Sequence, residues 1–186
     1  MKQDDKPNVQ LEIREGRVSS PYPHFRFCPV KISNTAHITR ENIVELGEEF
    51  SIEQSTVDVF LAYFLSKHFD GDLIYNKNRT GLNPTELYWC GQNFFTYKSV
   101  YAMLSEITKI ADLFAADYDD PALAAIKEEI EVEFGYWDTP NTMLTGDPAI
   151  FNCRYILADF YRSFATRLSK MMENNPSTNL ICVAGA

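Results

Sequence analysis

Closely spaced glycines are missing from this sequence. Its 186 residues include eight glycines, and no two of them are closer than ten positions apart. Loops in which backbone N–H groups approach a phosphate or an oxyanion need glycines at shorter spacing, as in G-x-G-x-x-G, the Walker A loop and the G-x-S-x-G elbow. This absence argues against common nucleotide-dependent enzymes and α/β-hydrolases. No other catalytic motif is recognisable, so the sequence leans away from an enzyme without deciding the question.

Metal-ligand spacing is missing as well. The four cysteines, Cys28, Cys90, Cys153 and Cys182, form no C-x-x-C motif and no close Cys/His pair of the zinc-site kind. None of the three histidines belongs to a motif such as H-E-x-x-H. We therefore predict no metal and no other cofactor. We expect all four thiols to be reduced, as is usual in a cytosolic chain of this size.

Long apolar runs are also absent. The longest run has seven residues, Val59 to Leu65, whereas a membrane-spanning helix needs roughly 20. Residues 1–10 lack the apolar segment of a signal peptide. We expect a soluble, cytoplasmic protein without a membrane partner. The length suits one domain, and we assign residues 1–8 to a flexible N-terminus and 9–186 to a single domain.

Negative charge is what the sequence has in excess, and it is unevenly distributed. The net charge is −9, and the segment from Glu106 to Asp138 holds ten acidic residues against two basic ones, so the rest of the chain is close to neutral. Such a field repels nucleic-acid backbones and anionic lipid, which argues against nucleic acid as a partner. It favours a basic protein partner.

Two-residue periodicity marks the first part of the chain as strand. Apolar and polar residues alternate over 9–14, a turn at residues 15–16 is expected to reverse the chain, and a second strand is expected over 24–32. Pro29 interrupts that second strand, which suggests an edge position or a bulge.

Capping signals predict two helices in the next part. Thr39 can cap a short helix over 39–46. Ser51 and Gln54 fit the capping box of a longer, largely apolar helix that ends before residue 70. Short strands are expected over 73–75 and 87–90, with the alternative that the second belongs to a helical segment.

Helical periodicity dominates the second half of the chain. Stripes of apolar residues with spacings of three and four predict helices over 96–116, 122–134 and 148–173, and Pro148 suits the first position of the last one. A continuous apolar run over 180–184 predicts a buried final strand. Together these elements predict an α+β fold: about five helices packed with a small, mostly antiparallel sheet of four or five strands.

The leading functional hypothesis is an acidic module for protein–protein interaction, such as an inhibitor, an immunity protein or a regulatory adaptor. The predicted helix over 122–134 carries acids over most of its surface and is followed by two large aromatic residues in a loop. Acidic surfaces speed the encounter with a basic partner, and Tyr and Trp often anchor interfaces. The predicted partner-binding residues are Glu128, Glu129, Glu131, Glu133, Tyr136 and Trp137.

The alternative hypothesis is a small-molecule-binding or enzymatic domain with an aromatic-lined pocket. The segment 88–101 holds six aromatic residues, and alternation in the second strand places an imidazole, a guanidinium and a thiol on one face, where the thiol could act as a nucleophile. The possible pocket residues are Tyr88, Trp89, Tyr97, His24, Arg26 and Cys28.

Nucleic-acid binding is the least favoured hypothesis, because the overall field opposes it. Basic residues that could contact a phosphate backbone occur in two sets along the chain. They are Lys77, Arg79 and Lys98, and Arg154, Arg162, Arg167 and Lys170. The sequence indicates neither the oligomeric state nor the identity of a partner.

Overall fold

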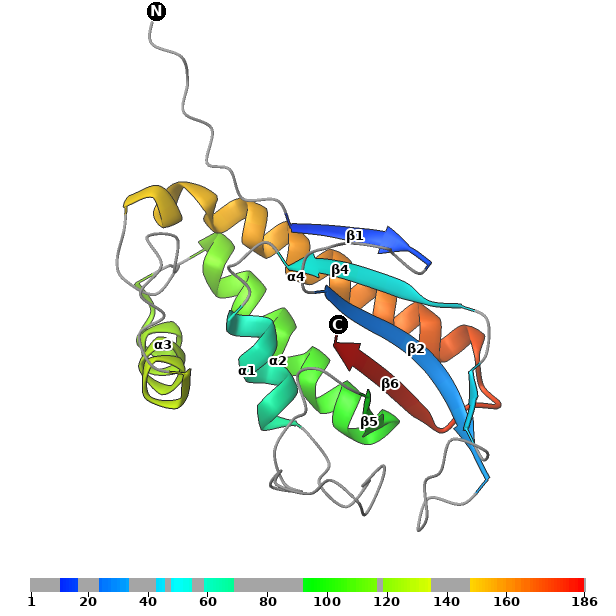
Figure 1. Cartoon of the computed structure of the whole chain (residues 1–186). Coiled ribbons are helices and arrows are strands. Elements are labelled where there is room, and N and C mark those ends of the chain that lie inside the picture. Colours follow the sequence, from blue (N-terminus) through cyan, green and yellow to red (C-terminus); the bar gives the residue numbers. More distant parts are fainter. Residues whose placement is uncertain are drawn as a thin grey trace, which may run out of the picture.

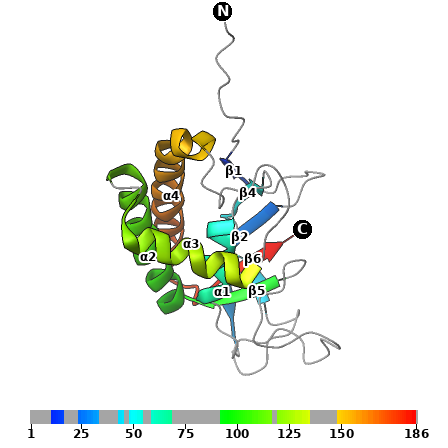
Figure 2. The same cartoon turned by 90° about the vertical axis from the view of Figure 1, so that its left-hand side faces the viewer.

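A computed structural model shows an α+β fold in which helices pack against one face of a single antiparallel sheet (Figures 1 and 2). It describes residues 11–16, 24–33, 43–45, 48–54, 59–68, 92–116, 119–134 and 148–185. These ranges contain six strands and four helices, one helix fewer than expected.

The sheet has the strand order β1-β4-β2-β6-β5, with β3 paired to the far part of β2 (Figure 1). Every strand pair in it is antiparallel. The predicted final strand is confirmed as β6, and it lies inside the sheet between β2 and β5. The strands are β1 (Leu11–Glu15), β2 (His24–Ile32), β3 (Ile43–Glu45), β4 (Phe50–Gln54), β5 (Gln92–Thr96) and β6 (Leu180–Gly185).

The expected turn after β1 does not produce a hairpin with β2. Both strands pair with β4 in antiparallel fashion, so β1 and β2 run in the same direction with β4 between them. Gly16 has a φ of 74°, a conformation that glycine adopts without a steric penalty. Its N–H donates to the carbonyl of Glu49 at 2.9 Å, which fastens the end of β1 to the start of β4.

Pro29 lies inside the sheet, so the predicted edge position is wrong. Ile32 donates its N–H to the side chain of Asn179, just before β6, and accepts a hydrogen bond from it. In an antiparallel sheet, successive residues of a strand direct their main-chain N–H and C=O groups to opposite neighbouring strands. The even-numbered residues of β2 therefore direct these groups toward β6, and Pro29 directs its main chain toward the opposite neighbour. On that side, pairing with β4 ends at Phe27 and pairing with β3 begins at Val30. The missing N–H of proline therefore falls where β2 changes partners.

The helices of the second half agree with their predicted positions. Val100, Leu104, Ile107, Ala111 and Phe114 form the predicted stripe of α2, and all are buried. The helices are α1 (Val59–Lys67), α2 (Tyr97–Ala116), α3 (Pro121–Phe134) and α4 (Pro148–Asn174). α2 and α4 pack side by side on the sheet, and α3 lies beyond α1 at one end of the molecule (Figures 1 and 2).

Local signals at the starts of α3 and α4 explain where they begin. The side chain of Asp120 accepts a hydrogen bond from the N–H of Ala122 at 2.8 Å, and this contact caps α3. α4 begins at Pro148, the position that proline tolerates best. Its predicted stripe is buried at the residues whose side chains are described: Leu157, Phe160, Tyr161, Phe164, Leu168 and Met171.

One predicted helix is wrong, and a second is confirmed as α1 but with a different start. Residues 43–45 of the helix expected over 39–46 form β3, where two neighbouring β-branched side chains suit a strand. Ser51 and Gln54 belong to β4 rather than to a capping box, and the helix starts at Val59. The predicted strands over 73–75 and 87–90 lie outside the described residues, as do the ends of the chain, while β5 was not predicted.

The buried apolar residues form two clusters, one on each face of the sheet. The larger lies between the sheet and the helices, where Phe27 stacks on Phe50 at 5.0 Å between ring centroids and meets Phe164 edge-on at 5.2 Å. The smaller cluster lies on the opposite face, here termed the outer face. It consists of Cys28, Val30, Ile32, Phe94, Leu180 and Cys182.

Candidate functional site

Titratable side chains from three helices meet where α1, α2 and α3 approach one another. α1 ends at Lys67, and His68 continues its last turn by donating its N–H to the carbonyl of Phe64. Basic residues are favoured at this end of a helix by the helix dipole. The Nζ atom of Lys67 lies 3.0 Å from Oε2 of Glu106 on α2, and Nε2 of His68 lies 3.4 Å from the same oxygen. Glu106 thus links α2 to the end of α1.

Lys67 and Glu106 each favour the charged form of the other. Burial alone would raise the pKa of Glu106, but the hydrogen bond from Lys67 and the neighbouring His68 bring it below its ordinary value of 4.5. Burial alone would lower the pKa of Lys67, and contact with Glu106 raises it above 10.5. Although His68 is close, its Nε2 atom has no hydrogen-bond partner among the described residues. Lys67 is therefore the main partner of Glu106.

Tyr63 connects α1 to the acidic helix α3. Its ring is buried, and its hydroxyl donates a hydrogen bond to Oε2 of Glu129. Burial and this carboxylate both raise the pKa of Tyr63, so its hydroxyl stays protonated and remains a donor. Lys67, one turn further along α1, lies 5.6 Å from the centre of the same ring. Glu129, predicted to bind a partner, is engaged within the molecule.

Glu128 is the other predicted partner-binding residue whose side chain the structure describes. Glu128 is exposed on α3, and no ion pair joins it to another residue of the described ranges. Glu131 and Glu133 belong to the last turns of α3, but their side chains lie outside the description, and so do Tyr136 and Trp137.

One acid of the segment from Glu106 to Asp138 is paired with a basic residue of α4. The Nη2 atom of Arg162 lies 2.8 Å from Oδ1 of Asp112 on α2, and Nη1 lies 3.9 Å from Asp159. Both Arg162 and Asp112 remain largely exposed, so the pair is a surface contact. Glu106 and Asp112 therefore have basic partners, and not every acid of the segment from Glu106 to Asp138 is free of a counter-charge.

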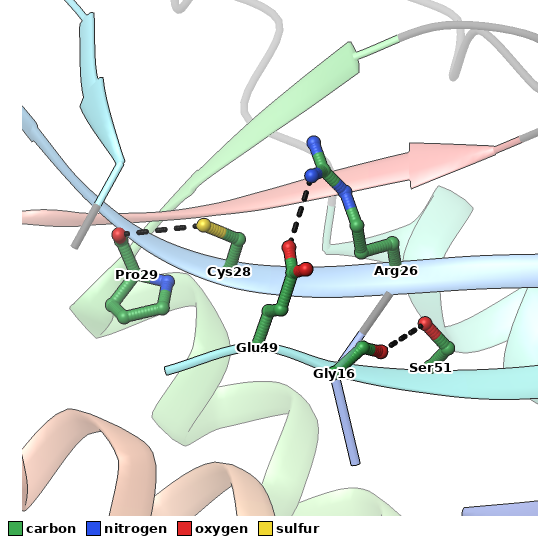
Figure 3. A network of polar contacts seen from close by, with 6 residues as sticks. All are labelled: Gly16, Arg26, Cys28, Pro29, Glu49 and Ser51. Atoms are coloured by element: carbon green, nitrogen blue, oxygen red, sulfur yellow. Dashed lines mark hydrogen bonds and ion pairs between the residues drawn. The ribbon is translucent and has the colours of Figure 1, made fainter. Parts of the chain in front are cut away.

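A second polar site lies on the outer face of the sheet, around Arg26 (Figure 3). Its guanidinium group donates to Oε2 of Glu49 at 2.9 Å, and the side chains are only 8% and 21% exposed. Ser51, which faces Arg26 in the strand register, donates its hydroxyl to the carbonyl of Gly16 at 3.0 Å. A buried charge requires such a partner because leaving it unpaired in a low-dielectric environment is costly. The site fixes the start of β4 against β2.

The residues predicted to line a pocket are not all brought together. Arg26 and Cys28 lie on the outer face, as alternation predicted, and both are buried rather than solvent-facing. Tyr97 packs against the larger cluster on the helix side, where its hydroxyl contacts Thr178 and donates to the carbonyl of Asn175 at 3.2 Å. His24 starts β2 but its side chain is not described, and Tyr88 and Trp89 lie outside the described residues.

Two basic residues from the nucleic-acid hypothesis have acidic partners. Arg162 pairs with Asp112, and Arg167 forms an ion pair with Glu15, which joins α4 to β1. Lys98 and Lys170 are exposed, while Lys77, Arg79 and the side chain of Arg154 are outside the description. The paired arginines weaken the case for a continuous basic surface on α4.

The polar cluster at the helix junction was missed in the sequence. Tyr63 and Lys67 are four positions apart, a spacing that places two side chains on one side of a helix. This spacing was the one local pattern that could have indicated the cluster. The partners Glu106 and Glu129 are 39 and 62 residues away from Lys67 in the sequence. No local pattern connects them, so only the packing of the three helices brings them together.

Neither metal binding nor membrane crossing finds support in the described part of the chain. Within it, no group of three or more His, Cys, Asp or Glu residues is placed to hold a metal ion. None of the helices described there combines the length and the apolar character that a membrane crossing requires.

Comparison with known proteins gave no matching family model, no matching curated protein and no matching solved structure.

Proposed function

We propose that this protein is a binding module that docks a basic protein partner on the acidic surface of α3. The observation that carries the proposal is the position of Glu128, which is exposed on α3 and has no counter-charge among the described residues. Elsewhere in the acidic segment, Glu106 and Asp112 have basic partners within the molecule. In this proposal Glu128 and the acids that follow it on α3 attract a basic surface.

The attachment of α3 suits a helix that presents charge to a partner. Leu123 is fully buried and Ile126 packs against the same core, while the hydrogen bond from Tyr63 fixes Glu129 at the boundary of the core. These contacts fasten the described side chains Leu123, Ile126 and Glu129 of α3 to the rest of the molecule. In this proposal Glu128, Glu131 and Glu133 contact the partner, and Glu129 is a positioning residue for the helix.

The alternative of a small-molecule or enzymatic pocket is less well supported. Its predicted residues Arg26 and Cys28 lie across the sheet from Tyr97, so they do not converge with it on one site. Arg26 and Tyr97 also have structural partners, namely Glu49 and the connection between α4 and β6. We therefore favour docking over catalysis.

The proposal is tested with a defined basic probe, a fluorescent helical peptide rich in Lys and Arg, whose binding is followed by anisotropy. Binding should weaken as salt is raised, because exposed charges separated by more than about 10 Å are screened at 0.1 M ionic strength. Glu128→Lys should weaken binding several-fold. The matched control is Glu173→Lys, which changes the net charge equally at an exposed position near the end of α4.

Two results would contradict docking on α3. If Glu128→Lys and Glu173→Lys weaken binding equally, the peptide responds only to net charge. If neither variant changes the affinity, α3 does not form the contact. Circular dichroism of both variants confirms that any loss of binding is not a loss of fold.

A further inference from the structure

Two cysteines face each other across neighbouring strands on the outer face of the sheet. Cys28 of β2 and Cys182 of β6 are direct partners in the antiparallel register. Both are buried in the smaller apolar cluster, and neither is in a disulfide bond. They are 154 positions apart in the sequence, so the fold alone makes them neighbours.

The main-chain geometry places these two residues within range of a disulfide bond. Ile32 exchanges hydrogen bonds with the side chain of Asn179, so even-numbered residues of β2 direct their main-chain groups toward β6. Cys28 and Cys182 are then a hydrogen-bonded pair, for which the Cα atoms are about 5.5 Å apart. Disulfide bonds span Cα separations of about 4.4 to 6.8 Å. Closure therefore requires only a local contraction of the sheet and no change of strand pairing.

We propose that Cys28 and Cys182 are a redox modification site that closes to a reversible disulfide in the presence of a hydroperoxide. One thiol, as its thiolate, attacks the peroxide oxygen and becomes a sulfenic acid, while the O–O bond breaks and water or an alcohol leaves. The second thiol then attacks that sulfur, the S–S bond forms, and the hydroxyl group leaves as water. The thiols lose two electrons, and the peroxide gains them.

Burial determines which oxidant can reach the pair. Cys182 and Cys28 are 1% and 2% exposed, so a bulky disulfide such as oxidised glutathione cannot approach either sulfur in the folded protein. Hydrogen peroxide is small and neutral, so a small local opening over the outer face admits it. The thiol of Cys28 contacts the carbonyl of Pro29 at 3.6 Å (Figure 3), and this weak hydrogen bond is given up when the disulfide forms.

The same geometry makes the bond easy to reduce. Cβ atoms of directly opposite residues are about 4.5 to 5.5 Å apart, with hydrogen-bonded pairs at the wider end, whereas a disulfide needs about 3.8 Å. The sheet must contract locally, and a strained disulfide is more readily reduced. The bond is therefore suited to reversible control rather than to permanent stabilisation. While closed, it ties β6 to β2 covalently.

The test uses the wild-type chain, treated with hydrogen peroxide in its folded state, quenched with a thiol-blocking reagent and digested. We expect a peptide containing Cys28 linked to one containing Cys182, a mass loss of two hydrogens, and reversal by dithiothreitol. Oxidised glutathione should produce far less of this product. The oxidised protein should also melt at a higher temperature than the reduced one.

Variants separate this pair from the other two cysteines. Cys90→Ser/Cys153→Ser keeps the pair and should still form the disulfide, whereas Cys28→Ala should not. The proposal is overturned if peroxide gives only sulfinic or sulfonic acids at Cys28 and Cys182, or only links involving Cys90 or Cys153. It is also overturned if oxidised glutathione forms the disulfide as fast as peroxide does. Peptide mapping of the wild-type chain decides the matter even if a variant folds poorly, and no outcome depends on the docking proposal.

Discussion

The two faces of the sheet use different interactions to stay packed. On the helix side, aromatic rings from two strands and α4 interlock, with Phe27, Phe50 and Phe164 at the centre. On the outer face, a smaller apolar cluster adjoins the buried ion pair of Arg26 and Glu49. The helix side gains its stability from apolar area and shape. The outer face additionally depends on satisfying a charge that water cannot reach easily.

The ion pairs of the helical layer show how much the environment matters. Arg162 and Asp112 lie 2.8 Å apart, almost the same separation as Arg26 and Glu49, but their side chains are 44% and 64% exposed. Water solvates both ions when such a pair breaks, so exposed pairs contribute little. Two ion pairs with nearly equal N–O distances are therefore expected to contribute unequally to the free energy of unfolding. Mutations on the two faces of the sheet can measure this difference.

The largest effect is expected on the helix side. Phe164→Ala removes the ring that contacts both Phe27 and Phe50, and the resulting cavity should lower the free energy of unfolding by about 3–5 kcal/mol. Urea denaturation measures the change. Thr166→Ala, at an exposed position of α4, is the control and should change it by less than about 0.5 kcal/mol. A loss below about 1 kcal/mol for Phe164→Ala would mean that this cluster is not the centre of the core.

The second-largest effect is expected for the buried ion pair on the outer face. Glu49→Gln removes the carboxylate charge that pairs with Arg26 and should lower the free energy of unfolding by about 2–3 kcal/mol. The double variant Arg26→Met/Glu49→Gln should recover part of this loss, because no buried charge remains to be satisfied. A double-mutant cycle measured by urea denaturation gives the coupling. Simple additivity of the two single changes would show that the pair has no special role.

A smaller, pH-dependent effect is expected at the helix junction. The pKa of Glu106 is lower in the folded state than its ordinary 4.5, so its contribution to stability is present above pH 4.5 and is lost as pH falls below that value. Between about pH 5 and pH 3, the wild type should therefore lose more stability than Glu106→Gln does. Melting temperatures across this range provide the measurement, with Glu173→Gln as the exposed control. Parallel curves for wild type and Glu106→Gln would contradict the assignment.

The smallest effect is expected for the exposed pair on α2 and α4. Asp112→Asn removes the partner of Arg162 and should change the free energy of unfolding by at most about 1 kcal/mol. That difference should shrink further when the measurement is repeated at high salt. A cost similar to that of Glu49→Gln would abolish the distinction drawn between the exposed and the buried ion pair.

The sequence predicted best what depends on one long, periodic segment. The stripes of α2 and α4 extend over several turns, and each buries the residues that its spacing predicted. The alternation that placed Arg26 and Cys28 on one face also proved correct. In both cases the pattern is repeated often enough that tertiary packing does not override it.

Short segments with two competing signals were where the sequence misled. Ser51 and Gln54 match a capping box, yet Phe50 and Ile52 lie on either side of Ser51, and burial of those two side chains in the core favours the strand. Pro29 signalled an edge because the sequence does not show that β2 changes partners at that residue. Contacts such as Tyr63 with Glu129 join residues 66 positions apart, and no local pattern reports them.

The place of β6 in the sheet has a consequence for synthesis. β5 has β6 as its neighbour in the strand order, and β6 also completes the pairing of β2. Residues 180–185 must therefore emerge from the ribosome before β6 can pair with β2 and β5, although β2 was synthesised some 150 residues earlier. Until then β2 and β5 expose unpaired backbone, a condition that invites association with other chains. Nascent chains halted before residue 180 should accordingly depend on chaperones far more than the finished protein does.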